Sequence, residues 1–216
     1  TQVVPYCVDN KILDVAWQLF TTNKPIAGLP GLLEKLPTIP DGLEKEEKVK
    51  YLSKYFEAKQ RNDSLTGKRF NVARTLTIAQ EYKDVDHFYF SVFIDFRGRL
   101  YYHGDHFQPQ STDLGKALLQ FKSKKVIENN FFYFVHGANC LGADKVSYQE
   151  RYNIIKNKRV EIQAIAEDPI HNIDLWANAD SPFSYLAFCI DVAEYWKDPE
   201  NYESGLRICC DASSSG

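Results

Sequence analysis

The 216-residue sequence predicts an α+β fold that is mostly helical, with a small antiparallel sheet. Apolar residues recur at helical spacing behind good capping residues, both before residue 84 and after residue 111. Between these regions, His87 to Tyr102 alternates aromatic and β-branched residues in the manner of paired strands. The change of character predicts a helical first part, 1–84, and an α+β body, 85–216.

The first part is predicted to open with one amphipathic helix and a loop. Asp9 is a typical N-cap residue, and apolar residues follow it at helical spacing, which predicts a helix over 9–22. Prolines and glycines then crowd the stretch 24–42, which predicts a loop.

Two long helices are predicted to follow that loop. Asp41, with Glu44 three positions on, has the spacing of a capping box and would start a charged helix through about Arg61. Ser64 would cap the next helix, which runs to about Tyr82. Because only a short turn joins the two helices, we expect them to form an antiparallel hairpin.

Basic residues cluster around that predicted turn. Between positions 59 and 74 five basic residues stand against one acidic residue, a local charge of five minus one, or +4. The five are Lys59, Arg61, Lys68, Arg69 and Arg74. Two interpretations stay open: a solvated helix tip, which is the more common case, or a finger that lies along a phosphate backbone.

The body is predicted to begin with a β-hairpin, whose two strands flank the turn Arg97-Gly98-Arg99. The Ser-Thr-Asp sequence at 111–113 would cap a helix through about Phe121. The other predicted elements are helices over 127–141, 147–166 (with a Ser147–Glu150 capping box), 172–178 and 181–197, a loop over 197–205 and a closing strand over 206–210.

Composition argues against several classes of protein. The net charge of −3 does not suit a protein that binds nucleic acid through overall basicity, although a local basic surface remains compatible. The five cysteines show no zinc-ligand spacing, so we expect reduced thiols, with Cys140 and Cys189 in the core. No apolar run of 18 residues and no secretory leader occurs, which predicts a soluble, non-secreted protein.

The last eleven residues, LRICCDASSSG, predict a chemical site. Apolar residues precede Asp211 and small residues follow it, so its carboxylate would stand on a rigid strand with room around it. Such a carboxylate suits a metal or phosphate ligand. Phosphoryl-transfer sites usually hold two divalent ions, so a further carboxylate is expected from upstream or from another polypeptide.

The segment DFRGR (95–99) is a second candidate site. Gly98 permits a tight turn, and the planar forks of Arg97 and Arg99 suit phosphate. On its own such a pattern is more often an exposed hairpin. His136 and Asn139, by contrast, are expected to satisfy buried hydrogen bonds on a helix rather than to do chemistry.

Four further segments follow DFRGR in order: HFQPQSTDLGKALLQF (106–121), HGANCLGADKVSYQER (136–151), DSPFSYLAFC (180–189) and CCDASSSG (209–216). Together the five closely resemble the single-subunit, phage-type DNA-dependent RNA polymerases, a family that also includes mitochondrial enzymes. The resemblance covers nearly the whole chain, because DNKILDVAWQLF (9–20) is also similar to the family's segment that leads into the thumb.

The resemblance implies a fragment of a right-hand polymerase. Residues 1–84 would be the helical-hairpin thumb with its leading helix, and 85–216 the N-terminal part of the palm, ending at motif A. It implies template-directed nucleotidyl transfer by a two-metal mechanism with Mg²⁺ as cofactor, and with DNA template, RNA product and nucleoside triphosphates as partners.

The resemblance also assigns roles to individual residues. Asp211 matches the motif A aspartate that binds both catalytic Mg²⁺ ions, and the backbone carbonyl of Ala212 matches a weaker metal contact. Lys145 matches a lysine near the triphosphate of the incoming nucleotide. The residues that match contacts to the template or the RNA–DNA hybrid are Asp95, Arg97, Gly98, Arg99, Tyr101 and Lys116. Ala212, Gln108 and Ser111 depart from the family's usual Gly, Asn and Gly.

Two motifs of the family do not occur in this sequence: the motif B helix with Lys, Tyr and Gly, and the motif C His-Asp-Ser hairpin. The chain is therefore either a fragment of a longer protein or one part of a divided enzyme. We expect the smaller subunit of a split, heterodimeric phage RNA polymerase, inactive without a second subunit that supplies motifs B and C. The lack of an Arg/Ser-rich presequence favours the cytoplasm of an infected bacterial host over the mitochondrial matrix.

Two alternatives belong to other classes. The first is a non-catalytic nucleic-acid-binding clamp subunit of a polymerase complex, although the joint presence of Asp211, Arg99 and Lys145 speaks against it. The second is an unrelated phosphotransferase with an aspartate nucleophile. That enzyme would need another Asp two positions after Asp211, where Ser213 stands.

Overall fold

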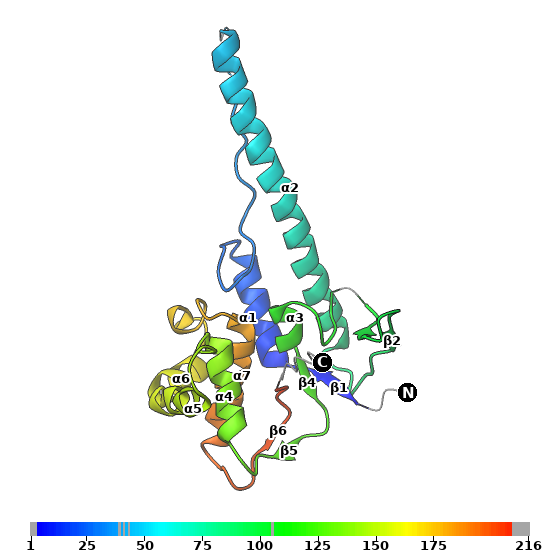
Figure 1. Cartoon of the computed structure of the whole chain (residues 1–216), viewed down its shortest axis with the longest axis vertical. Helices are drawn as coiled ribbons and strands as arrows, with labels where there is room; N and C mark the ends of the chain where they lie inside the picture. Colours follow the sequence, from blue (N-terminus) through cyan, green and yellow to red (C-terminus); the bar gives the residue numbers. More distant parts are fainter. Residues whose placement is uncertain (1–3, 39, 41, 43, 105, 209–216) are drawn as a thin grey trace.

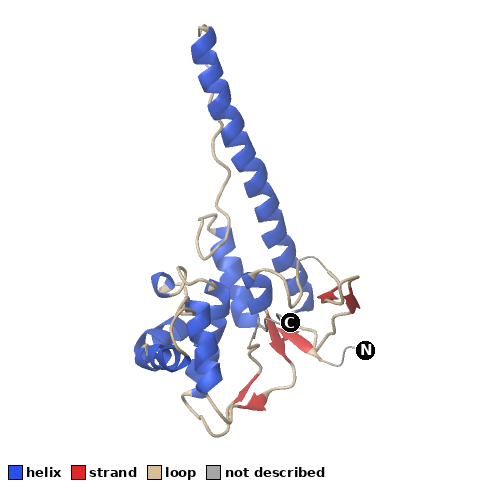
Figure 2. Ribbon diagram, in the orientation of Figure 1, coloured by secondary structure: helices blue, strands red, loops and turns tan. Residues whose placement is uncertain are grey.

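One long helix projects from a helical body in the computed structural model of the chain (Figure 1). The structure describes residues 4–38, 40, 42, 44–104 and 106–208. The helices far outweigh three small two-stranded antiparallel sheets (Figure 2). The α+β class predicted from the sequence is confirmed.

The first described elements of the chain lie within the body. Strand β1 (Tyr6–Val8) pairs antiparallel with β4 (Leu119–Phe121), and helix α1 (Asn10–Thr21) buries its apolar stripe in the core. Asp9 caps α1 as predicted, because its Oδ1 accepts hydrogen bonds from the backbone N–H groups of Lys11 at 3.0 Å and Ile12 at 3.2 Å. The predicted helix over 9–22 is confirmed.

Helix α2 (Lys45–Tyr82) is one continuous helix of 38 residues. The predicted turn after Arg61 and the antiparallel helical hairpin are therefore wrong. No proline stands there to break the helix, and the polar side chain of Ser64 stays exposed on it. The predicted capping box is also wrong: Glu44 is the N-cap without a side-chain cap bond, and Asp41 lies outside the described residues.

The loop after α1 takes the place of the expected second helix. It runs beside α2 toward the tip of the projection (Figure 1). Asn62, which is buried on α2, exchanges two hydrogen bonds of 2.8 Å with the backbone N–H and C=O of Glu34. The Glu34 carboxylate also pairs with Arg61 at 3.0 Å. These contacts tie the loop to the side of the helix.

The predicted β-hairpin is confirmed as β2 (Val92–Ile94) and β3 (Leu100–Tyr102), with Val92 opposite Tyr102. Helix α3 (Asp113–Ala117) has the predicted cap region, with Thr112 as N-cap, but ends early because the next residues form β4 against β1. At residues 119–121, pairing with the distant strand β1 has therefore prevailed over the local helical pattern of the sequence.

The rest of the body is helical. It contains α4 (Phe131–Leu141), α5 (Tyr148–Asn157), α6 (Arg159–Glu167), a 3₁₀ turn (Ile173–Leu175) and α7 (Pro182–Tyr195). The capping box of Ser147 and Glu150 is confirmed, but the predicted single helix over 147–166 breaks at Lys158. Strand β5 (Lys125–Val126) pairs with β6 (Glu203–Ser204), and β6 lies inside the stretch 197–205 that was predicted as a loop.

Helix α7 is the centre of the core. It is buried on nearly all sides, as expected of a helix that is apolar all round. Gly137 of α4 lets it approach closely, because a Cβ there would lie 2.3 Å from the Phe188 ring. Cys140 and Cys189 are buried, as predicted. Leu206 to Ile208 are not in a strand, and the rest of the predicted closing strand lies outside the described residues.

In the part of the chain that the structure describes, no helix combines the length and the apolar character needed to cross a membrane.

Candidate functional site

The DFRGR segment forms the turn between β2 and β3. Gly98 takes a left-handed backbone conformation with φ of 77°, which favours glycine. The Asp95 carboxylate accepts hydrogen bonds from the backbone N–H groups of Arg97 and Arg99, both at 2.9 Å, across the turn. The bond from Arg99, and after it the Arg97 side chain, hold the pKa of Asp95 below its ordinary value. Asp95 therefore organises the turn as a carboxylate.

The two arginines of this turn differ in the contacts that their side chains make. Arg97 donates from Nε to Asp95 at 3.0 Å and lies 5.3 Å from the centre of the Phe96 ring. It also approaches the Tyr101 hydroxyl at 3.4 Å. Arg99 is exposed, and its side chain makes no hydrogen bond to any residue that the structure describes. Arg99 is thus the cation of this turn that remains available to a phosphate.

A polar cleft of about 370 Å³ contains Lys116. Residues of α3, α4 and α7 line it, including His136 and Asn139 of the HGANC segment and Ser184 of the DSPF segment. The structure thus brings Lys116 together with two segments that lie far from it in sequence. Neither Arg99 nor Lys145 lines this cleft.

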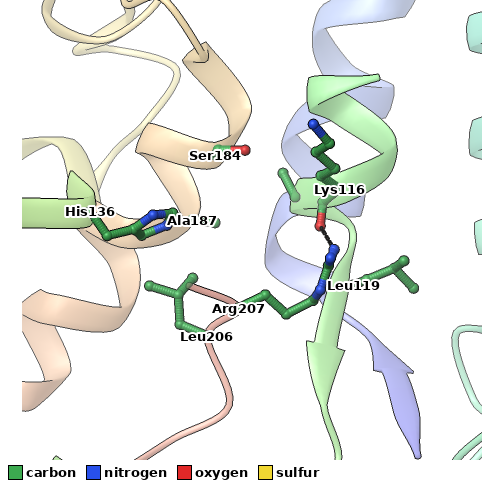
Figure 3. A pocket seen from close by; sticks show the side chains of 8 residues that line it. Lys116, Leu119, His136, Ser184, Ala187, Leu206 and Arg207 are labelled. Carbon is green, nitrogen blue, oxygen red and sulfur yellow. Dashed lines mark hydrogen bonds between the residues drawn. The ribbon is translucent and has the colours of Figure 1, made fainter. Parts of the chain in front are cut away.

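His136 also lines a smaller pocket that adjoins the cleft (Figure 3). Burial, followed by the nearby charge of Arg207, lowers its pKa to about 4, so the ring is neutral near pH 7. Its Nε2 lies 3.7 Å from the Cys140 sulfur. These contacts agree with the structural interpretation of His136 made from the sequence.

Arg207 is a residue that sequence reasoning missed. Its guanidinium donates to the backbone carbonyls of Lys116 at 3.2 Å and Pro109 at 3.1 Å (Figure 3 shows the first). It also lies over the Tyr6 ring at 5.8 Å. It thereby fixes the backbone four residues before Asp211. The one available signal was an arginine within an apolar run, which needs internal acceptors if it is to be buried.

Asp113 was expected only as part of a cap for α3, yet it caps α7. Its carboxylate accepts hydrogen bonds from the backbone N–H groups of Phe183 at 2.8 Å and Ser184 at 3.1 Å. The residues lie 70 and 71 positions apart in sequence, so no local pattern could have revealed the contact. Asp113 joins two of the motif segments directly.

The basic residues of α2 fall into two groups. Arg69 donates to the Gly31 carbonyl at 3.0 Å and to Asn23 Oδ1 at 2.8 Å, and Arg61 pairs with Glu34. These two arginines hold the loop to the helix. The other three, Lys59, Lys68 and Arg74, are exposed and make no side-chain hydrogen bond or ion pair to any described residue.

Lys145 stands on the loop between α4 and α5, where its side chain is exposed. Asp211 and Ala212 lie outside the described residues. Within the described ranges, no three His, Cys, Asp or Glu side chains are grouped so that they could hold a metal ion. The roles expected for Asp211, Ala212 and Mg²⁺ therefore stay predictions.

Comparison with known proteins identifies relatives along the whole chain. A family model described as DNA-dependent RNA polymerase matches residues 125–216. The DNA-directed RNA polymerase of Enterobacteria phage T3 is 34% identical over 215 residues, which cover 97% of this chain and 24% of the relative. T7 RNA polymerase of Escherichia phage T7 is 32% identical over 216 residues, with 97% and 24% covered.

An organellar relative matches the same region. The mitochondrial DNA-directed RNA polymerase 1B of Nicotiana tabacum is 29% identical over 216 residues, which cover 97% of this chain and 22% of the relative. The chain spans about a quarter of the length of the curated relatives it matches. The resemblance found in the sequence is confirmed: along nearly its whole length, the chain is similar to DNA-directed RNA polymerases of phages and mitochondria.

Proposed function

We propose that this chain is a subunit of a DNA-directed RNA polymerase, the smaller half of an enzyme divided between two polypeptides. The observation that carries the proposal is the sequence match along the whole chain to the polymerases of phages T3 and T7. The Lys116 cleft supports it, because three of the five segments that resemble the family contribute to that one surface.

In this proposal Asp211 is the catalytic carboxylate, and the carbonyl of Ala212 is a weaker metal contact. Bound Mg²⁺ supplies positive charge for the attacking and leaving oxygens of nucleotidyl transfer. Arg207 serves this site indirectly, because its bonds to two backbone carbonyls fix the chain just before the aspartate.

The nucleic acid would contact other parts of the chain. Arg99, exposed at the tip of the β2–β3 turn, suits a backbone phosphate of the template or hybrid because its fork donates two parallel hydrogen bonds. Lys116 would contact the same strands from the polar cleft. Lys145 would contribute a point charge to the triphosphate of the incoming nucleotide.

The second polypeptide would supply motifs B and C, neither of which occurs in this sequence. The assembled enzyme would use a DNA template and nucleoside triphosphates, release RNA, and act in the cytoplasm of an infected bacterial host. The similarity to phage polymerases supports this setting.

The decisive experiment replaces Asp211 with Asn in the assembled polymerase. We expect template-directed extension of a primer with Mg²⁺ and nucleoside triphosphates to be abolished, while size-exclusion chromatography shows normal assembly. Asp14→Asn, an exposed carboxylate on α1, is the matched control and should extend normally. Extension by Asp211→Asn near the wild-type rate contradicts the catalytic role and favours a non-catalytic clamp subunit.

The divided arrangement has its own test. This chain alone, supplied with Mg²⁺, nucleoside triphosphates and a primed template, should make no RNA. Adding the second polypeptide should restore synthesis. Measurable synthesis by the chain alone would show that it needs no partner.

A further inference from the structure

The loop that carries Lys145 is fixed at both ends by helix caps. Gly142 ends α4 in the left-handed conformation with φ of 108°, and Ala143 N–H donates back to the Ala138 carbonyl at 2.9 Å. The capping box of Ser147 and Glu150 begins α5. Only four residues, 143–146, lie between the two caps.

Arg151, in the first turns of α5, forms hydrogen bonds with the backbone of this short loop. Its Nε donates to the Val146 carbonyl at 2.9 Å, and a terminal nitrogen donates to the Asp144 carbonyl. These two carbonyls belong to the residues immediately after and before Lys145. The other terminal nitrogen donates to Asn139 Oδ1 on α4 at 3.0 Å. One guanidinium therefore fixes the backbone on both sides of Lys145 and ties it to the HGANC helix.

The Lys145 side chain has the opposite character. It is exposed and makes no hydrogen bond or ion pair to any described residue. Lysine is a flexible point charge, so the place that its ammonium can reach depends on where its backbone is held. A clamped backbone that bears a free ammonium is what a site needs when it must present one positive charge to a ligand.

We propose that Arg151 is a positioning residue for Lys145: it holds the α4–α5 loop so that the Lys145 ammonium meets the triphosphate of the incoming nucleotide. The inference rests on the proposed function and adds to it the residue that fixes the nucleotide contact. Arg151 itself touches no nucleotide. Its planar fork is essential, because lysine cannot donate to three acceptors in the same fixed arrangement.

The test is a double-mutant cycle in the assembled polymerase, with the KM for nucleoside triphosphate and kcat measured separately. Lys145→Ala should raise KM about tenfold, the size expected when a charged hydrogen bond is lost. Arg151→Lys keeps the charge but should raise KM several-fold. The double variant should match Lys145→Ala alone, because Arg151 acts only through Lys145.

Arg159 on α6 provides the matched control. Arg151 lies 5.0 Å from the centre of the Tyr148 ring, and Arg159 likewise lies 5.1 Å from the centre of the Trp196 ring, but Arg159 makes no hydrogen bond to the described residues of the Lys145 loop. Arg159→Lys should leave KM unchanged. In the isolated full chain, Arg151→Lys should also speed tryptic cleavage after Lys145, whereas Arg159→Lys should not. This second readout needs no polymerase activity.

The possible outcomes separate the two proposals. If Lys145→Ala raises KM and Arg151→Lys does not, or if the two effects multiply in the double variant, the positioning role is overturned. If Lys145→Ala leaves KM unchanged, this inference also fails, while loss of synthesis in Asp211→Asn would still support the proposed function.

Discussion

The buried carboxylate of Asp191 is held by neutral hydroxyl donors. Asp191 on α7 accepts hydrogen bonds from the hydroxyls of Tyr133 at 2.6 Å, Tyr202 at 2.8 Å and Ser204 at 2.6 Å. Burial, followed by the charge of Asp191, raises the pKa of Tyr133 well above its ordinary value, so this phenol remains a donor. Three donors compensate much of the cost of burying the carboxylate.

His136 leads to a prediction for the pH dependence of stability. Its pKa is about 4 in the folded chain and about 6.5 when exposed. Above pH 6.5 both states are neutral and the histidine has no effect. Between pH 6.5 and 4, His136 is protonated in the unfolded state but neutral in the folded state, so the stability of the fold decreases as the pH falls.

At pH 5.0 this effect costs about 2 kcal/mol of the free energy of unfolding. His136→Gln removes the titrating group, so urea unfolding should show a smaller loss between pH 7.5 and pH 5.0 than in the wild type. Arg207, Lys116 and Cys140 lie near the ring and stay unchanged in the variant. Equal losses in the two proteins would show that folding does not lower the pKa of His136.

At the scale of elements, the sequence predicts helix caps reliably where the capping residue contacts the helix that directly follows it. Asp9 and the Ser147–Glu150 pair were identified correctly because capping depends on contacts within three positions. Asp113 and Arg207 were missed as anchors because their partners lie far away in sequence. The candidate site depends mostly on contacts of this second kind.

The helical hairpin was predicted wrongly for a related reason. The polar run after Arg61 is typical of a turn, but Asn62 is polar because it binds the backbone of the loop beside α2. Its side chain satisfies a backbone N–H and C=O that would otherwise need water. A tertiary partner explains what the sequence pattern attributed to a turn.

Asn62 therefore leads to a prediction about how the loop is held. Asn62→Ala removes both bonds to Glu34 and should cost about 1–3 kcal/mol of loop docking. The result should be faster tryptic cleavage after Lys35, with little change in the thermal unfolding of the body. Asp63→Ala, an exposed neighbour on the same helix, should leave cleavage unchanged. If both variants are cleaved like the wild type, the Asn62 contact does not hold the loop.

At the scale of the whole molecule, the proposed function requires a chain with a net charge of −3 to bind nucleic acid through local cations. Arg61 and Arg69 are occupied within the protein, so the choice between a solvated helix and a phosphate-binding finger depends on Lys59, Lys68 and Arg74. At 3.6 residues per turn, Lys59 and Arg74 lie about 60° apart around α2, whereas Lys68 lies about 180° from Lys59. Lys68 also lines a pocket against the loop at 27–30.

Lys59 and Arg74 thus share one side of the projecting helix, and that side is where a phosphate backbone would lie. Each cation that meets a phosphate adds about 0.7–0.9 to the slope of log affinity against log salt concentration. Replacing both residues with Gln should lower the slope measured with a primed DNA template in the assembled polymerase by between one and two. Lys68→Gln, which removes one charge from the opposite side, should leave the slope almost unchanged. Equal slopes for all variants would show that α2 is a solvated helix, and an equal loss per charge on both sides would show that only the overall charge matters.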